Sequence, residues 1–95
     1  MTDRLTELKE RVGLLDNQLE RMENDFRRAL ITGETSNAKT TMNRLISEAQ
    51  STKEFTKALL SKFQIEDKDE KVNLCLRLLR YVENIENVIL ALQEA

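Results

Sequence analysis

Several residue types on which other folds depend are missing or rare in this chain of 95 residues. Proline is absent, and glycine occurs only at Gly13 and Gly33. Because proline breaks helices and glycine weakens them, their scarcity favours long uninterrupted helices. Aromatic residues make up only 4% of the chain, which argues against a β-sandwich or a β-barrel.

Histidine is also absent, and cysteine occurs once, at Cys75. The chain therefore lacks the commonest general base and zinc ligand, and it cannot form an internal disulfide. The stretch 33–41 contains glycine, lysine and hydroxyl residues, but it lacks the second glycine and the preceding strand of a phosphate-binding loop. The acidic pairs at 66–67 and 69–70 are typical of a solvated loop and a helix start. We expect no enzyme activity, no metal and no cofactor.

The charge balance argues against nucleic acids and membrane surfaces as partners. Fifteen basic and 17 acidic residues give a net charge of −2, whereas a nucleic-acid interface or a polybasic membrane surface needs a strong positive field. No stretch approaches the roughly 18 consecutive apolar residues of a membrane span, and no secretory signal precedes the first charged segment. We expect a cytoplasmic protein without nucleic-acid binding or membrane insertion, folded as a single domain over residues 1–95.

Two segments show the apolar spacing of amphipathic helices, with alternating steps of three and four. The first segment carries Leu5, Leu8, Val12, Leu15, Leu19, Met22, Phe26 and Ala29. The second segment carries Met42, Leu45, Ala49, Thr52, Thr56, Leu59 and Phe63. The centre of the second stripe is small or polar, which favours close approach of a neighbouring helix. Thr2 or Asp3 is the expected N-cap of the first helix, and Thr35 or Ser36 that of the second.

A third segment follows the loop at 64–69. Asp67 with Glu70 resembles a capping box, and the helix it starts is acidic, whereas the second helix is basic; this favours their pairing. Both loops are short, so consecutive helices are expected to be antiparallel neighbours. The predicted fold is all-α, an up-down-up three-helix bundle with helices at about 3–30, 37–63 and 68–93.

The third helix carries more apolar residues than two neighbours require. One stripe, sufficient to face the other helices, is Leu74, Leu78, Tyr81, Ile85, Val88 and Leu92. A second set lies beside it: Val72, Cys75, Leu76, Leu79, Val82, Ile89 and Leu90. Part of this second set is expected to be exposed, and exposed apolar surface is where partners dock. The alternatives are that this helix is simply the most buried, or that it forms a homodimer.

The stretch 78–89, with Val82-Glu83-Asn84-Ile85 and the pair Val88-Ile89, resembles the last helix of GAT domains. These are three-helix bundles of the GGA and target-of-Myb clathrin adaptors. The acidic loop at 66–70 and the segment 15–19 are also similar to that family. The resemblance implies a domain that binds ubiquitin, or helical segments of endosomal or actin- and clathrin-linked proteins. It implies a cytoplasmic location, peripheral to endosomal or plasma membranes, and we expect a monomer.

The resemblance also implies two ubiquitin surfaces. On the third helix, the family's two aliphatic residues and following acidic residue correspond to Cys75, Leu79 and Glu83. Leu76 and Val82, from the second apolar set, extend this surface.

The other surface corresponds to Asn17, Arg21, Asp25 and Arg44. Only Asn17 keeps the family's residue type. Arg21 and Asp25 replace apolar contacts, and Arg44 reverses a charge.

Two other functions fit the same pattern. A syntaxin-like Habc bundle would bind a SNARE helix along a groove and would have no affinity for ubiquitin. An unrelated helical adaptor that self-associates would show a mass that depends on concentration. The pattern of the residues does not choose among these partners.

Overall fold

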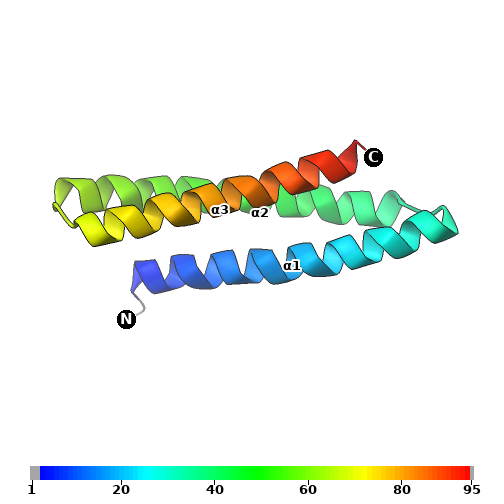
Figure 1. Ribbon diagram of the computed structural model, residues 1–95, viewed down its shortest axis with the longest axis horizontal. Helices are drawn as coiled ribbons and strands as arrows, with labels where there is room; N and C mark the ends of the chain where they lie inside the picture. Colours follow the sequence, from blue (N-terminus) through cyan, green and yellow to red (C-terminus); the bar gives the residue numbers. More distant parts are fainter. Residues whose placement is uncertain (1–2, 95) are drawn as a thin grey trace.

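Three helices account for the secondary structure of residues 3–94, the part of the chain that the computed structural model describes (Figure 1). They are α1 (Arg4–Thr32), α2 (Ser36–Ile65) and α3 (Asp69–Gln93). The chain runs up, down and up along one long axis, so that α1 and α3 run in the same direction (Figure 1). The predicted fold class is confirmed, and each predicted helix boundary lies within two residues of the observed one.

Local signals in the sequence explain both ends of α1. The Asp3 carboxylate accepts a hydrogen bond from the backbone N–H of Leu5 at 3.3 Å, which is the bond expected of an N-cap. Thr2, the other predicted cap, lies outside the described residues. At the far end Gly33 has a φ of 81°, and its N–H bonds to the carbonyl of Ala29. Glycine adopts this left-handed backbone without a steric penalty, so Gly33 ends α1.

The corner between α2 and α3 differs from the prediction. Asp67 has a φ of 55°, and the N–H groups of Asp67 and Lys68 bond to the carbonyls of Gln64 and Phe63. This is a Schellman motif that ends α2, with aspartate at the position glycine usually occupies. The predicted capping box at Asp67 is therefore wrong. Lys68 is the residue at the N-cap of α3, and no side chain caps that helix.

The core contains the predicted faces of α1 and α2. Every residue of the α2 stripe is buried, and only Ala29 of the α1 stripe is partly exposed. Two threonines, Thr52 and Thr56, lie in this core at 4% and 0% exposure. Their hydroxyls donate to the carbonyls of Glu48 and Thr52 at 2.8 and 2.7 Å, so neither hydroxyl is left without a partner. The small side chains at the centre of α2 allow close packing, and α2 and α3 are the most closely packed pair.

Charge supports the same pairing. Lys53 of α2 forms an ion pair with Glu86 of α3 at 2.9 Å, and the two side chains are only 20% and 13% exposed. The second carboxylate oxygen of Glu86 is buried without a hydrogen-bond partner. The prediction that the basic second helix pairs with the acidic third helix is confirmed.

The predicted buried face of α3 is wrong. The helix is rotated about its own axis relative to the prediction, so a different face points into the core. Its buried residues are Cys75, Val82, Ile85 and Ile89. By contrast, Tyr81 and Val88 of the predicted core stripe are 43% and 41% exposed. Because α3 packs extensively on α2 and little on α1, its buried side turns towards α2. The residues on its α1 side stay at the edge of the core.

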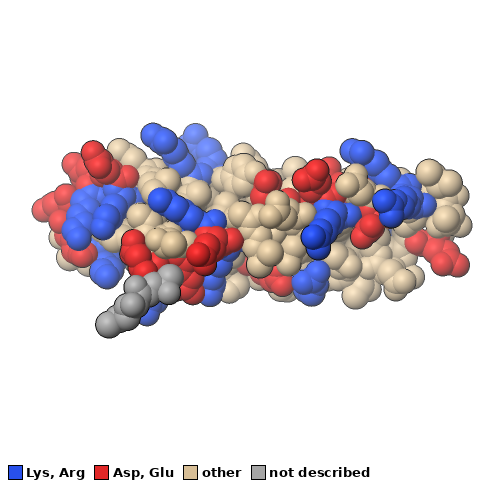
Figure 2. Space-filling view, turned by 90° about the horizontal axis from the view of Figure 1, so that it is seen from below, with Lys and Arg blue, Asp and Glu red and all other residues tan. Residues whose placement is uncertain are grey.

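Charged side chains of both signs lie on the face of the molecule that Figure 2 shows. Lys and Arg side chains alternate with Asp and Glu along the face seen in Figure 2, with uncharged surface between them. Within residues 3–94, none of the helices has the length and apolar character needed to cross a bilayer.

Candidate functional site

The predicted docking residues on α3 divide into two groups. Cys75 and Val82 are 0% exposed, so they are core residues and the prediction that they contact a partner is wrong. They are seven positions apart, as residues of one buried helix face are. Leu79 is half-buried, Leu76 is 47% exposed and Glu83 is exposed. Only these last three remain available to a partner.

The available residues lie on one side of the helix. Steps of four, three, four and seven residues place them in a row along α3, which we call the α3 flank: Val72, Leu76, Leu79, Glu83 and Leu90. This side lies next to α2, because Glu86 and Gln93, which bond to Lys53 and Asn43 of α2, lie on the adjoining part of the helix surface. The α3 flank therefore combines aliphatic side chains with a carboxylate at the edge of the α2–α3 pair.

Burial also defines the chemistry of Cys75. Desolvation raises the pKa of the Cys75 thiol above its ordinary value, because a low-dielectric environment disfavours the charged form. The thiol stays protonated at neutral pH. It contributes a small apolar side chain to the core, as free cysteines commonly do.

On the opposite edge of α3, Tyr81 bonds to α1. Its hydroxyl donates to the Asp16 carboxylate at 2.5 Å. This bond, with desolvation and the negative charge of Asp16, raises the pKa of Tyr81. Among the described residues, this is the side-chain hydrogen bond that joins α1 to α3. An exposed polar contact therefore adds to the apolar core that α1 and α3 share.

The second predicted surface is polar throughout. Asn17, Arg21 and Asp25 are exposed and follow one another at steps of four along α1. Arg44 of α2 is exposed and pairs with Glu48 at 3.3 Å, so its charge is already compensated within its own helix. No aliphatic side chain belongs to this predicted set, and it offers a partner little apolar contact.

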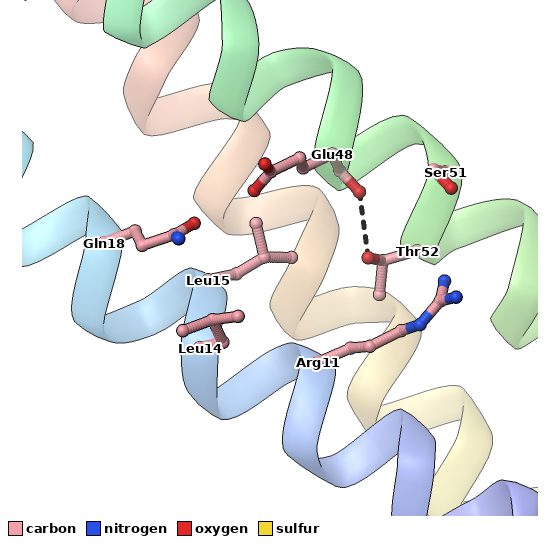
Figure 3. Close-up of a pocket in the computed structure, with 7 residues that line it drawn as sticks. All are labelled: Arg11, Leu14, Leu15, Gln18, Glu48, Ser51 and Thr52. Carbon is pink, nitrogen blue, oxygen red and sulfur yellow. Dashed lines mark hydrogen bonds between the residues drawn. The ribbon is translucent and has the colours of Figure 1, made fainter.

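A groove between α1 and α2, which the apolar spacing of the sequence does not predict, lies beside the core (Figure 3). It has a volume of about 270 Å³. Figure 3 shows α1 residues on one wall and α2 residues on the other: Arg11, Leu14, Leu15, Gln18, Glu48, Ser51 and Thr52. The amide oxygen of Gln18 is buried there without a hydrogen-bond partner. The only sequence signal was Leu14, an aliphatic residue outside the α1 stripe that is 57% exposed.

One wall of this groove is fixed by Arg11. Its guanidinium lies 4.5 Å from the centre of the Phe55 ring and 3.6 Å from the Glu7 carboxylate. A cation over an aromatic face is attracted by the ring's negative face. Arg11 therefore links α1 to α2 at the outer edge of the core.

No group of three or more potential metal ligands occurs within residues 3–94. No protein family, no curated protein and no solved structure matches this chain. The class of protein that the structure defines is an all-α three-helix bundle.

Proposed function

We propose that this chain is a non-catalytic interaction domain that binds ubiquitin through the α3 flank. The observation that carries the proposal is the exposed Leu76 and the half-buried Leu79 beside the exposed carboxylate of Glu83. Ubiquitin presents an apolar patch ringed by basic residues, so aliphatic side chains next to an acid are complementary to it. The resemblance of stretch 78–89 to GAT domains independently suggests the same helix and the same ligand.

The expected affinity is low. Cys75 and Val82 are buried, so the apolar part of the contact reduces to a few aliphatic side chains on one helix. Such a contact falls below the area of a standard stable interface. A binding free energy of about −4 to −6 kcal/mol corresponds to a Kd on the order of 0.05–1 mM. Weak binding of this kind suits a domain that samples ubiquitinated membrane cargo on the cytoplasmic side of endosomal or plasma membranes.

The direct test is an NMR titration of the isotope-labelled chain with unlabelled ubiquitin, at a low concentration of the chain. We expect saturable shifts at Leu76, Leu79 and Glu83. Glu83→Lys is expected to weaken binding at least tenfold, because it places a cation against ubiquitin's basic rim. Glu20→Lys makes the same charge change at an exposed site on α1 and serves as the matched control.

Leu76→Ala and Leu14→Ala form a second matched pair, since both leucines are about half exposed and only Leu76 lies on the α3 flank. Binding that is lost equally in both variants would contradict the site. Shifts centred on Asn17, Arg21, Asp25 and Arg44 would move the site to α1 and α2. An absence of shifts at millimolar ubiquitin would refute the proposal.

A second candidate function is the binding of a partner helix, as in a syntaxin-like bundle that binds a SNARE helix. It is favoured by the line along which α1 meets α3. Tyr81 and Val88 of α3 lie there and are 43% and 41% exposed, because α1 and α3 are the least closely packed pair of helices. An amphipathic helix bound along the line between α1 and α3 would cover both residues. A SNARE-helix peptide that shifts Tyr81 and Val88, with no effect of ubiquitin on any resonance, would support this function over the first.

A further inference from the structure

The outer face of α3, opposite its buried side, carries charges that reverse in sign along the helix. Residues at helical spacing form this face, all of them exposed: Asp69, Glu70, Asn73, Leu76, Arg77, Arg80 and Asn84. The first two residues are acidic, Asn73 is neutral, and Arg77 and Arg80 are basic. The face is therefore acidic on one side of Asn73 and basic on the other.

The two arginines have no carboxylate partner within 4 Å among residues 3–94. The positions three and four residues before and after Arg77, where a carboxylate could pair with it on the same helix, carry no acidic residue: they are 73, 74, 80 and 81. Both arginines border a shallow depression of about 490 Å³. Its remaining lining is Asn73, Leu76, Tyr81 and Asn84. Arg80 has Glu83 three residues further along the helix, but neither arginine forms an ion pair within the described chain. The basic half of the face is thus a concave, partly apolar surface with two arginines that form no ion pair.

We propose that this outer face binds a second copy of the chain, with the two α3 helices antiparallel and a two-fold axis passing at Asn73. Asp69 lies four residues before Asn73 and Arg77 lies four residues after it. At 1.5 Å per residue, each is about 6 Å from the axis. Antiparallel packing about Asn73 therefore sets Asp69 of one copy opposite Arg77 of the other, twice.

The same geometry extends beyond this pair. Arg80 lies nearly one turn further along and comes opposite the α2–α3 corner of the second copy. That corner carries Glu66 and Asp67, with Ile65 beside them at 84% exposure. An exposed aliphatic residue next to carboxylates is complementary to the depression, which has Leu76 and Tyr81 next to its arginines. Apolar contact and opposite charge thus occur together at both ends of the interface.

A second copy is the occupant that the charge pattern favours, because the pattern is complementary to itself. A two-fold interface uses the same surface on both subunits. With the axis at Asn73, Asp69 and Arg77 lie at equal distances on either side of it, and so do Glu66 and Arg80, whereas Glu70 comes opposite Leu76. Such an interface also closes after two subunits. Because only one helix face is involved and its charges are exposed, the dimer is weak and sensitive to salt.

The outer face shares only Leu76 with the α3 flank. Glu83, on which ubiquitin binding depends, is not among the residues that pair in the dimer, and Arg77 is not on the α3 flank. Glu83→Lys and Arg77→Asp therefore separate the two proposals. Loss of self-association does not remove ubiquitin binding, and loss of ubiquitin binding does not remove self-association.

The experiment is sedimentation equilibrium on the full chain between about 20 µM and 2 mM. In 50 mM salt the mean mass is expected to rise from 11.1 kDa towards twice that value. In 500 mM salt it is expected to stay near the monomer value, because the charges are screened. Asp69→Arg and Arg77→Asp are each expected to raise the dimer Kd at least tenfold.

Mixing the two variants provides the decisive measurement. Asp69→Arg places like charges at both contacts of its own dimer, and so does Arg77→Asp. In an equimolar mixture, however, each contact of the mixed dimer again joins an acid to a base, so the mixture is expected to recover a dimer Kd near that of the original chain. Asp25→Arg and Arg28→Asp make the same charge changes on exposed parts of α1 and are expected to leave the dimer unchanged.

A chain that stays monomeric at 2 mM in low salt overturns the proposal. A chain that dimerises while the mixture of variants does not overturns the antiparallel geometry about Asn73. Circular dichroism checks that each variant is folded. Recovery in the mixture also excludes misfolding as the reason why a single variant fails.

Discussion

Two valines on α3, six positions apart, test its packing with one chemical change. Val82 is 0% exposed and Val88 is 41% exposed, whereas the apolar spacing of the sequence placed Val88 in the core and Val82 in the surplus set. Val82→Ala removes two methyl groups from a fully buried site. Their transfer from water is worth about 0.8 kcal/mol each, and the cavity left behind adds to the loss. We expect the free energy of unfolding to fall by about 2–3 kcal/mol.

Val88→Ala is the matched control. It removes the same atoms from an exposed site, and alanine is a better helix former than valine by up to about 0.5 kcal/mol. The expected change lies within about 0.5 kcal/mol of zero. Urea denaturation followed by circular dichroism measures both variants, and an unchanged dependence on urea would show that only stability has changed. Equal losses, or a larger loss for Val88→Ala, would refute the observed register of α3.

Two further predictions concern the α2–α3 corner and the buried thiol. Asp67→Gly is expected to raise the free energy of unfolding by about 0.5–1 kcal/mol, because a φ of 55° crowds any side chain but costs glycine nothing. Asp67→Ala is the control and keeps the crowding, so a gain from alanine as large as that from glycine would contradict this explanation. Stability is expected to fall as the pH rises above the ordinary Cys75 pKa of 9.0, since the unfolded chain then loses a proton that the folded chain retains. Below that pH the thiol is protonated in both states and its contribution is complete. Cys75→Ala is expected to flatten the decline, and an unchanged pH dependence in this variant would contradict the burial of a protonated thiol.

The sequence by itself determined the helices and two of the three faces that form the core. The missing proline and the alternating steps of three and four specify long amphipathic helices without reference to the rest of the chain. In α1 and α2 a single apolar stripe leaves one way to bury the helix, so the stripes from Leu5 to Phe26 and from Met42 to Phe63 became the core. Gly33 ends α1 through its own left-handed backbone conformation, which is a local property.

Tertiary structure alone decided the rotation of α3. This helix carries apolar residues over more than half of its surface, so several rotations bury a similar area and periodicity cannot choose among them. Its closer packing on α2, next to the ion pair of Lys53 and Glu86, selected the rotation that buries Cys75 and Val82. The same rotation exposes Tyr81 and Val88, and it leaves Leu76, Glu83 and the half-buried Leu79 as the accessible part of the predicted docking site.

The corner at Asp67 and the groove beside Gln18 could not be predicted from the sequence, for a related reason. Asp67 suits either a helix cap or a left-handed helix end, and the path of the chain between α2 and α3 decided for the second. The groove depends on how far apart α1 and α2 lie at Leu14 and Thr52, which is set by side chains of both helices at once. Sequence periodicity describes one helix at a time, whereas the corner and the groove arise where two helices meet.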